Sequence, residues 1–194
     1  KELPARSADL IAGRGELLSS ALLAAYLDQA SPGAAWVDAR QVVKTDSRFG
    51  QARPDAQAIK AAAAARLLPL LGEGQIVVTQ GYIGSDPYQT PTTLGRGGSD
   101  YSASLLGAAV EAQEIQIWTD VEGVLTGDPR VVPEARPVEV LGYDEAAELA
   151  AFGAKVLHPA TILPAVELGI PVTVRNSLLP QGRFTTISKE GTRG

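Results

Sequence analysis

Apolar and polar positions along the chain alternate between two spacings, one helical and one extended. Leucine and alanine recur every three or four residues in five segments. They predict helices over residues 16–28, 54–71, 99–112, 143–152 and 159–169. Short apolar runs rich in β-branched residues predict strands over 35–39, 75–80, 115–119, 171–175 and 184–187.

These strands read as apolar on both faces and are separated by helices. That pattern indicates an α/β fold with three αβα layers and a mainly parallel central sheet. We find no repeat and no linker, so residues 1–194 are predicted to form a single domain. In such sheets ligands bind at the carboxyl ends of the strands, so the segments that follow the strands are the candidate sites.

Composition narrows the function classes. A net charge of −5 argues against a general nucleic-acid binder, although a local group of cations or amides could still hold phosphates. The chain has no cysteine, which excludes a disulfide framework, a thiolate metal site and a cysteine nucleophile. No continuous apolar stretch reaches the roughly 18–20 residues of a membrane helix, so no membrane partner is expected.

The strongest candidate site follows the strand over 75–80. The run Thr92–Asp100 reads Thr-Thr-Leu-Gly-Arg-Gly-Gly-Ser-Asp and leads into a helix. Its glycines let the backbone approach a ligand, Arg96 suits a carboxylate or phosphate, and Asp100 could hold a metal or orient a charged group. The alternative is a solvent-facing turn in which Ser99 caps the helix.

Two later loops could contact a nucleotide. Asp120 follows the strand over 115–119, and Arg130 follows an Asp-Pro turn; the alternative is two ordinary turns. Lys155 could place a charge on a phosphate or could be merely solvated. His158, the only histidine, precedes a proline and is expected to be a packed or capping residue.

Glu16 is predicted at the start of the first helix. An acid there could favour the helix dipole or could hold an ammonium group. Its position alone does not decide between the two roles.

Taken together, these segments resemble the catalytic domain of the aspartate kinases, in the amino acid kinase family. The matching stretches are 15–19, 48–50, 79–84, 92–101, 117–121, 128–130 and 152–160. The combination of Thr-Thr-Leu-Gly-Arg-Gly-Gly-Ser-Asp with Phe-Gly-Ala-Lys-Val-Leu-His-Pro is specific to this group. The resemblance implies an amino acid kinase (carbamate kinase-like) fold that transfers the γ-phosphoryl group of ATP, with Mg²⁺, to the side-chain carboxylate of L-aspartate.

The resemblance also implies roles for matching residues. Glu16 would hold the substrate ammonium group, and Asp100 would organise the catalytic charges. The substrate carboxylate would be held by Arg96, Gly97, Gly98 and Ser99. The ATP site would include Thr119, Asp120, Leu125, Arg130, Lys155 and Val156.

The chain departs from the family pattern in three places. It has no Lys-Phe-Gly-Gly segment of the kind that begins the family's domain, so the fold is expected to be incomplete at its N-terminus. ACT domains, which usually follow the catalytic domain in this family, are not expected within residues 1–194. Leu125 stands where many relatives have a tyrosine. The leucine would keep the apolar contact with the nucleotide and would lose the hydroxyl.

Several alternatives stay open from the sequence. The chain alone could be an inactive or nucleotide-binding-only fragment, or it could be a kinase for glutamate or acetylglutamate. The resemblance implies a cytoplasmic enzyme of lysine, threonine and methionine biosynthesis, with a homo-oligomeric parent protein. A Rossmann dehydrogenase is disfavoured, because its Gly-x-Gly-x-x-Gly spacing does not fit.

Overall fold

The computed structural model describes residues 3–127, 131–132, 134–151, 159–189 and 191. Its internal contacts divide the chain into two compact units, residues 1–110 and 111–194. Two compact units can belong to one domain, so the prediction of a single domain over 1–194 stays a prediction. Each unit is described by itself below.

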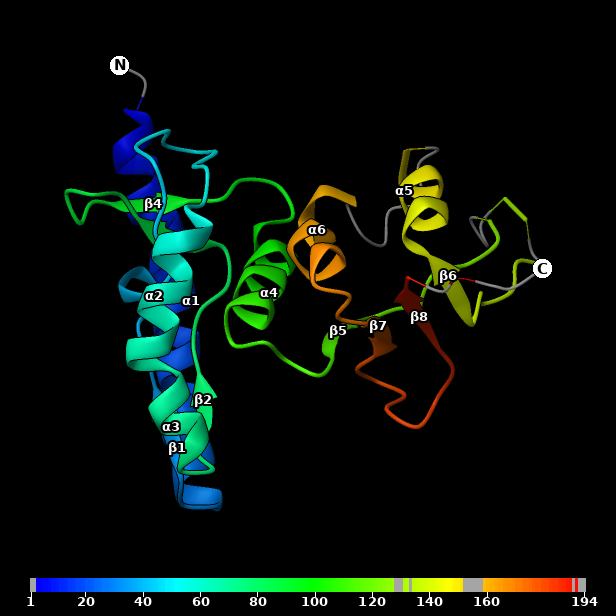
Figure 1. Cartoon of the computed structure of the whole chain (residues 1–194), viewed down its shortest axis with the longest axis horizontal. Coiled ribbons are helices and arrows are strands. Elements are labelled where there is room, and N and C mark those ends of the chain that lie inside the picture. Colours follow the sequence, from blue (N-terminus) through cyan, green and yellow to red (C-terminus); the bar gives the residue numbers. More distant parts are fainter. Residues whose placement is uncertain (1–2, 128–130, 133, 152–158, 190, 192–194) are drawn as a thin grey trace. The chain divides into compact units, whose positions relative to one another are not determined.

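Unit 1 places two small sheets against helices (Figure 1). Its helices are α1 (Ala5–Ala30), the 3-10 helix η1 (Ala39–Gln41), α2 (Ala56–Arg66), α3 (Leu68–Gly72) and α4 (Gly98–Ala109). Its strands are β1 (Ala34–Trp36), β2 (Ile76–Val78), β3 (Ile83–Ser85) and β4 (Pro91–Thr93). β1 pairs with β2 in parallel, and β3 pairs with β4 in an antiparallel hairpin. The core holds apolar side chains from η1, α2, β3 and α4.

Helix α1 begins at Ala5, so the prediction that it starts at Glu16 is wrong. The sequence expectation was misled by Gly13 and Gly15, because glycine disfavours helices. Packing explains Gly13: a Cβ at this position would lie 3.0 Å from Cγ2 of Ile83 on β3. Tertiary contact therefore requires a small residue there and overrides local propensity.

Unit 1 differs from the sequence expectations in three further places. The segment between β2 and α4, for which no strand was predicted, contains the β3–β4 hairpin. Ser99 does not cap α4: the N-cap is Gly97, in the left-handed region at φ 70°, and no side chain caps the helix. The second predicted helix begins at Ala56 rather than Pro54, with Asp55 accepting a hydrogen bond from the amide of Ala58.

The described part of unit 2 holds a four-stranded sheet and two helices. The elements are β5 (Ile115–Thr119), β6 (Val140–Gly142), α5 (Tyr143–Ala151), α6 (Pro159–Glu167), β7 (Val172–Asn176) and β8 (Phe184–Ser188). The strand order is β5-β7-β8-β6, with β5–β7 and β6–β8 parallel and β7–β8 antiparallel. The strand over 115–119 is confirmed at both ends, whereas β6 was not predicted. The α/β class is confirmed in both units.

The two faces of the unit 2 sheet differ in burial. Val172, Val174 and Ile187 are fully buried, whereas Arg175 and Phe184 lie on the opposite face. There the guanidinium of Arg175 stacks 3.9 Å from the ring centroid of Phe184. Alternation along the strands thus separates an apolar face from an amphipathic one.

One described helix, α1, is long and apolar enough to cross a membrane by length and composition alone. This differs from the sequence expectation, which counted only continuous apolar residues. Signal sequences and core helices of globular proteins pass the same test, so the finding carries no conclusion about location.

Candidate functional site

The centre of the candidate site in unit 1 is the segment that follows β2. Here the chain passes from Gln80 through Gly81 and Tyr82 into β3. A Cβ on Gly81 would lie 3.0 Å from Cα of Ser99, so this segment and the start of α4 are in backbone contact. Tyr82 adopts φ 70°, a left-handed conformation that costs energy for an aromatic residue and is held by the amide of Tyr82 donating to Ser102 Oγ at 2.9 Å.

Glu16 lies on the face of α1 that borders this segment. Gly13, one turn before it, packs on Ile83, and Ser20, one turn after it, accepts a hydrogen bond from Gln80. Residues three and four apart share one face of a helix, so the half-buried Glu16 lies beside residues 80–83. It stands eleven residues into α1, which removes the helix-dipole explanation that a first-turn position allowed.

Arg96 and Asp100 flank the left-handed start of α4. Arg96 is exposed and, within the described ranges, makes no side-chain hydrogen bond or ion pair. Asp100 is half-buried in the first turn of α4, and burial raises the pKa of its carboxyl group. A carboxylate in this setting is stabilised by any cation that binds beside it.

The glycines of this loop are required by packing as well as by conformation. A Cβ on Gly98 would lie 2.8 Å from Cδ2 of Tyr82 and 3.2 Å from Cβ of Leu94. Gly97 takes the positive φ that turns the chain into α4. The structure therefore brings Gly97, Gly98 and Ser99 together against the segment that Glu16 borders.

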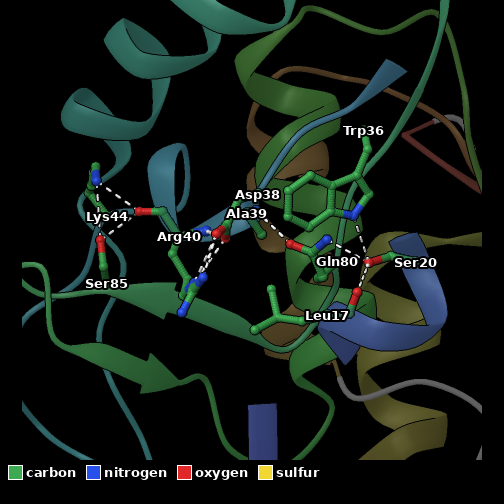
Figure 2. Close-up of polar contacts among 9 residues, drawn as sticks. All are labelled: Leu17, Ser20, Trp36, Asp38, Ala39, Arg40, Lys44, Gln80 and Ser85. Atoms are coloured by element: carbon green, nitrogen blue, oxygen red, sulfur yellow. Dashed lines mark hydrogen bonds and ion pairs between the residues drawn. The ribbon is translucent and has the colours of Figure 1, made fainter. Parts of the chain in front are cut away.

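A buried polar network ties this site to the ends of the parallel strands (Figure 2). Gln80 is 2% exposed; its Oε1 accepts from the amide of Ala39 at 2.7 Å, and its Nε2 donates to Ser20 Oγ at 2.6 Å. Ser20 Oγ also accepts from Trp36 Nε1 at 3.0 Å and donates to the carbonyl of Leu17. The network thus fixes α1 against the carboxyl ends of β1 and β2.

An ion pair lies next to this network. Nε and Nη2 of Arg40 donate to both carboxylate oxygens of Asp38, and Lys44 Nζ donates to the carbonyl of Arg40 and to Ser85 Oγ. Burial alone would raise the pKa of Asp38, but the hydrogen bonds and charge of Arg40 outweigh it and lower the pKa. Burial and the charge of Arg66 lower the pKa of Lys44. These cations are engaged within unit 1 and are not predicted site residues.

In unit 2 the candidate nucleotide residues lie at the carboxyl end of β5. Thr119 pairs with Asn176 at the parallel ends of β5 and β7. Its carbonyl accepts from the amide and the hydroxyl of Ser177, and its own hydroxyl donates to Asp120 Oδ1 at 3.1 Å. Asp120 is exposed, as expected for a group that contacts a ligand at this edge.

Thr185 holds the loop after Asp120 in place by hydrogen bonds. Its Oγ1 accepts from the amide of Val124 at 2.8 Å and donates to the carbonyl of Val138 at 2.6 Å. A Cβ on Gly123, at φ 114°, would clash with the side chain and amide of Thr185. Leu125 follows, half-buried and bridged to Pro137. Leu125, which is predicted to border the nucleotide, therefore lies in a loop that is held by hydrogen bonds to Thr185.

Three predicted nucleotide residues, Arg130, Lys155 and Val156, lie outside the described residues, as does His158. Their roles stay predictions.

Sequence reasoning gave no role to Asp9, Ser20, Gln80 or Tyr82. A helix running from Ala5 would have revealed the first two, because Asp9, Gly13, Ser20 and Ala24 form its buried face. Gln80 and Tyr82 lie in one of the stretches that resemble the family. No local sequence pattern, however, indicates that the Gln80 side chain is buried or that Tyr82 has a positive φ.

The comparisons with known proteins show the family of the chain. The model of the amino acid kinase family matches residues 1–176. Lysine-sensitive aspartokinase 3 of Escherichia coli is 50% identical over 179 residues, which is 92% of this chain and 40% of that protein. An aspartokinase of Thermus thermophilus is 42% identical over 175 residues, with 90% and 42% covered. The chain thus spans about two fifths of the length of these relatives.

Solved structures give the same picture. E. coli aspartokinase III in complex with aspartate and ADP matches with a TM-score of 0.89 and 48% identity, over 95% of this chain and 41% of that one. A UMP kinase from Bacillus anthracis matches with a TM-score of 0.67 at 19% identity, which shows a shared fold alone. The chain belongs to the amino acid kinase family.

Proposed function

We propose that the polypeptide containing this chain is an aspartate kinase, which transfers the γ-phosphoryl group of ATP to the side-chain carboxylate of L-aspartate. The observation that carries the proposal is that Glu16 and the Arg96–Asp100 stretch both border the same segment, residues 80–83. An α-amino acid needs an anion for its ammonium group and a cation for its carboxylate. The similarity to an aspartokinase structure holding aspartate and ADP supports the same substrates here.

In the proposed reaction the acceptor carboxylate is already ionised at neutral pH, so no strong general base is required. Catalysis then rests on positioning and on neutralising negative charge. Glu16 and Arg96 would hold the two α-groups, and the backbone of Gly97, Gly98 and Ser99 would border the substrate. Asp100 would hold a cation next to the reacting groups.

Mg²⁺ fits the donors that are present, although the described residues contain no cluster of three or more ligating side chains. This ion usually takes one or two carboxylates together with substrate phosphates. Asp100, whose pKa burial raises, would gain from such a cation. When bound, Mg²⁺ would neutralise charge on the phosphates.

For the nucleotide, Thr119, Asp120 and Leu125 would contact ATP at the edge of the unit 2 sheet, and Arg130, Lys155 and Val156 would complete its site. We also propose a cytoplasmic homo-oligomer that serves lysine, threonine and methionine biosynthesis. These finer statements rest on the family resemblance.

An acceptor comparison tests the proposal. With the full-length polypeptide and MgATP, ADP release should require L-aspartate and should not be supported by L-glutamate, N-acetyl-L-glutamate or UMP. Glu16→Gln should raise the KM for aspartate by about tenfold or more, since it removes a charge-assisted contact, with little change in the KM for ATP. Equal rates with another acceptor, or an unchanged KM in the variant, would overturn the assignment.

A further inference from the structure

A buried carboxylate on α1 has no role in the proposed reaction so far. Asp9 is 3% exposed, and both of its oxygens are used. Oδ2 accepts from the amides of Gly50 (2.9 Å) and Thr93 (3.0 Å), and Oδ1 accepts from Thr93 Oγ1 (2.9 Å). Burying a carboxylate is costly unless it is fully hydrogen-bonded, so this arrangement is a specific clamp rather than incidental contact.

The clamp joins the loop at Gly50 to the end of β4, and these two segments also touch each other. The amide of Ala52 donates to the carbonyl of Thr93 at 2.9 Å. A Cβ on Gly95 would lie 3.0 Å from the carbonyl oxygen of Gly50. The chain between Thr93 and Arg96 is therefore held both by Asp9 and by the loop at residues 50–52.

Asp9 and Glu16 stand seven residues apart on the same buried side of α1. Seven residues are about two helical turns, or roughly 10 Å along the axis. One rigid helix thus carries Glu16 directly and fixes, through Asp9, the start of the loop that carries Arg96. The two groups proposed to hold the ends of the amino acid are set relative to each other by this helix.

We propose that Asp9 is a positioning residue for the substrate site, which sets the Arg96 loop against Glu16 by hydrogen bonding to Thr93 and Gly50. The inference rests on the proposed function for its consequence in kinetics, and its structural part can be measured without any activity. Asp9 touches neither substrate nor ATP in this account.

The structure supplies a matched control. Asp86 is 2% exposed and, like Asp9, accepts from one hydroxyl (Ser47 Oγ, 2.8 Å) and two amides (Tyr88, 3.0 Å, and Thr90, 2.8 Å), with a further hydrogen bond from the Thr90 side chain. It lies at the opposite end of the β3–β4 hairpin from Thr93. Asp86→Ala removes an equivalent clamp without touching the Arg96 loop.

A conservative variant separates hydrogen bonding from charge. In Asp9→Asn the amide oxygen can accept from both backbone amides, and Nδ2 can donate to Thr93 Oγ1, which then acts as the acceptor. If Asp9 acts by positioning, Asn should largely restore what Ala removes.

The kinetic experiment uses the full-length polypeptide. Asp9→Ala should raise the KM for aspartate by about tenfold or more, because small misplacements of binding groups are costly, and should change the KM for ATP by less than about threefold. Asp9→Asn should lie within about threefold of the wild type, and Asp86→Ala should change the KM for aspartate by less than about twofold. Equal effects of Asp9→Ala and Asp86→Ala, or an Asn variant as impaired as the Ala variant, would overturn the proposal.

Hydrogen exchange of the amides of Gly50 and Thr93 tests the clamp independently of turnover. Both amides should lose about tenfold or more of their protection in Asp9→Ala, relative to Asp86→Ala, since each loses its acceptor. Unchanged protection would overturn the clamp. A wild type that exchanges as expected but does not phosphorylate aspartate would instead refute the proposed function.

If Asp9→Ala does not fold, Thr93→Val removes only the Oγ1 hydrogen bond and keeps the shape of the side chain. It should raise the KM for aspartate by about threefold. No change would count against the proposal.

Discussion

The hydroxyl of Ser20 should be worth far more to stability than that of its neighbour Ser19. Ser20 Oγ uses its full hydrogen-bonding capacity, since it donates to Leu17 and accepts from Trp36 and Gln80 (Figure 2). Ser19 Oγ is exposed and makes one long contact of 3.3 Å to the carbonyl of Glu16. The two serines share one helix and one amino-acid type, so Ser19→Ala is the control for Ser20→Ala.

The magnitude follows from what each alanine leaves behind. In Ser20→Ala the buried Nε2 of Gln80 loses its acceptor, which costs about 1–3 kcal/mol. Trp36 is 41% exposed, so its indole N–H can turn to water at little cost. Alanine also favours the helix over serine by about 0.5 kcal/mol. The net loss should be about 1–2 kcal/mol, or roughly 2–8 °C in Tm for a chain of this size.

Urea and thermal unfolding of the two variants measure this difference. Ser19→Ala should change the free energy of unfolding by no more than about 0.5 kcal/mol. If both variants unfold together with the wild type, the Gln80 amide is not held as described. If both are equally destabilised, the loss does not come from the buried network.

Three further predictions follow from the site and its surroundings. Asp100→Asn should abolish phosphoryl transfer without lowering the free energy of unfolding at pH 7. Burial raises the Asp100 pKa in the folded state, so the wild type loses stability as pH rises from about 4 through that raised value, and urea titrations of the variant should lack this loss. Gly98→Ala should cost about 1–3 kcal/mol in the same assay, because the new Cβ would lie 2.8 Å from the ring of Tyr82; a neutral effect would contradict the packing. Arg40→Ala should flatten the loss of stability below pH 4. The pKa of Asp38 is lowered in the folded state, so this group stabilises the fold above its unfolded-state pKa, and the stabilisation is lost as pH falls through the folded-state pKa. An unchanged dependence of the free energy of unfolding on pH below 4 would refute this.

The sequence predicted those parts of the fold that depend on local patterns. The boundaries of the strand over 115–119 are confirmed, but its burial alternates along the strand, whereas the sequence reading made the strands apolar on both faces. The start of α1 was not predicted, because Gly13 and Gly15 disfavour a helix locally, and the contact that requires a small residue at position 13 is with Ile83, seventy residues away. The β3–β4 hairpin was also missed; within it, Gly84 must be small because a Cβ there would lie 2.6 Å from the carbonyl oxygen of Val43, a distant contact that no local pattern marks.

The candidate site shows the same division. Arg96 and Asp100 were marked by their types and spacing beside glycines. Asp9 was not, since its partners at Gly50 and Thr93 are distant in the chain. Glu16 was identified, but its place within a long helix, which favours a binding role over a dipole effect, required the structure.

Trapping the acyl phosphate tests the central claim most directly. With MgATP, L-aspartate and hydroxylamine, the full-length polypeptide should form aspartyl hydroxamate, and Asp100→Ala should reduce the rate by about 100-fold or more. An absence of hydroxamate in the wild type, or an Asp100→Ala variant that forms it at the wild-type rate, would contradict the assignment of an aspartate kinase site centred on the Arg96–Asp100 loop.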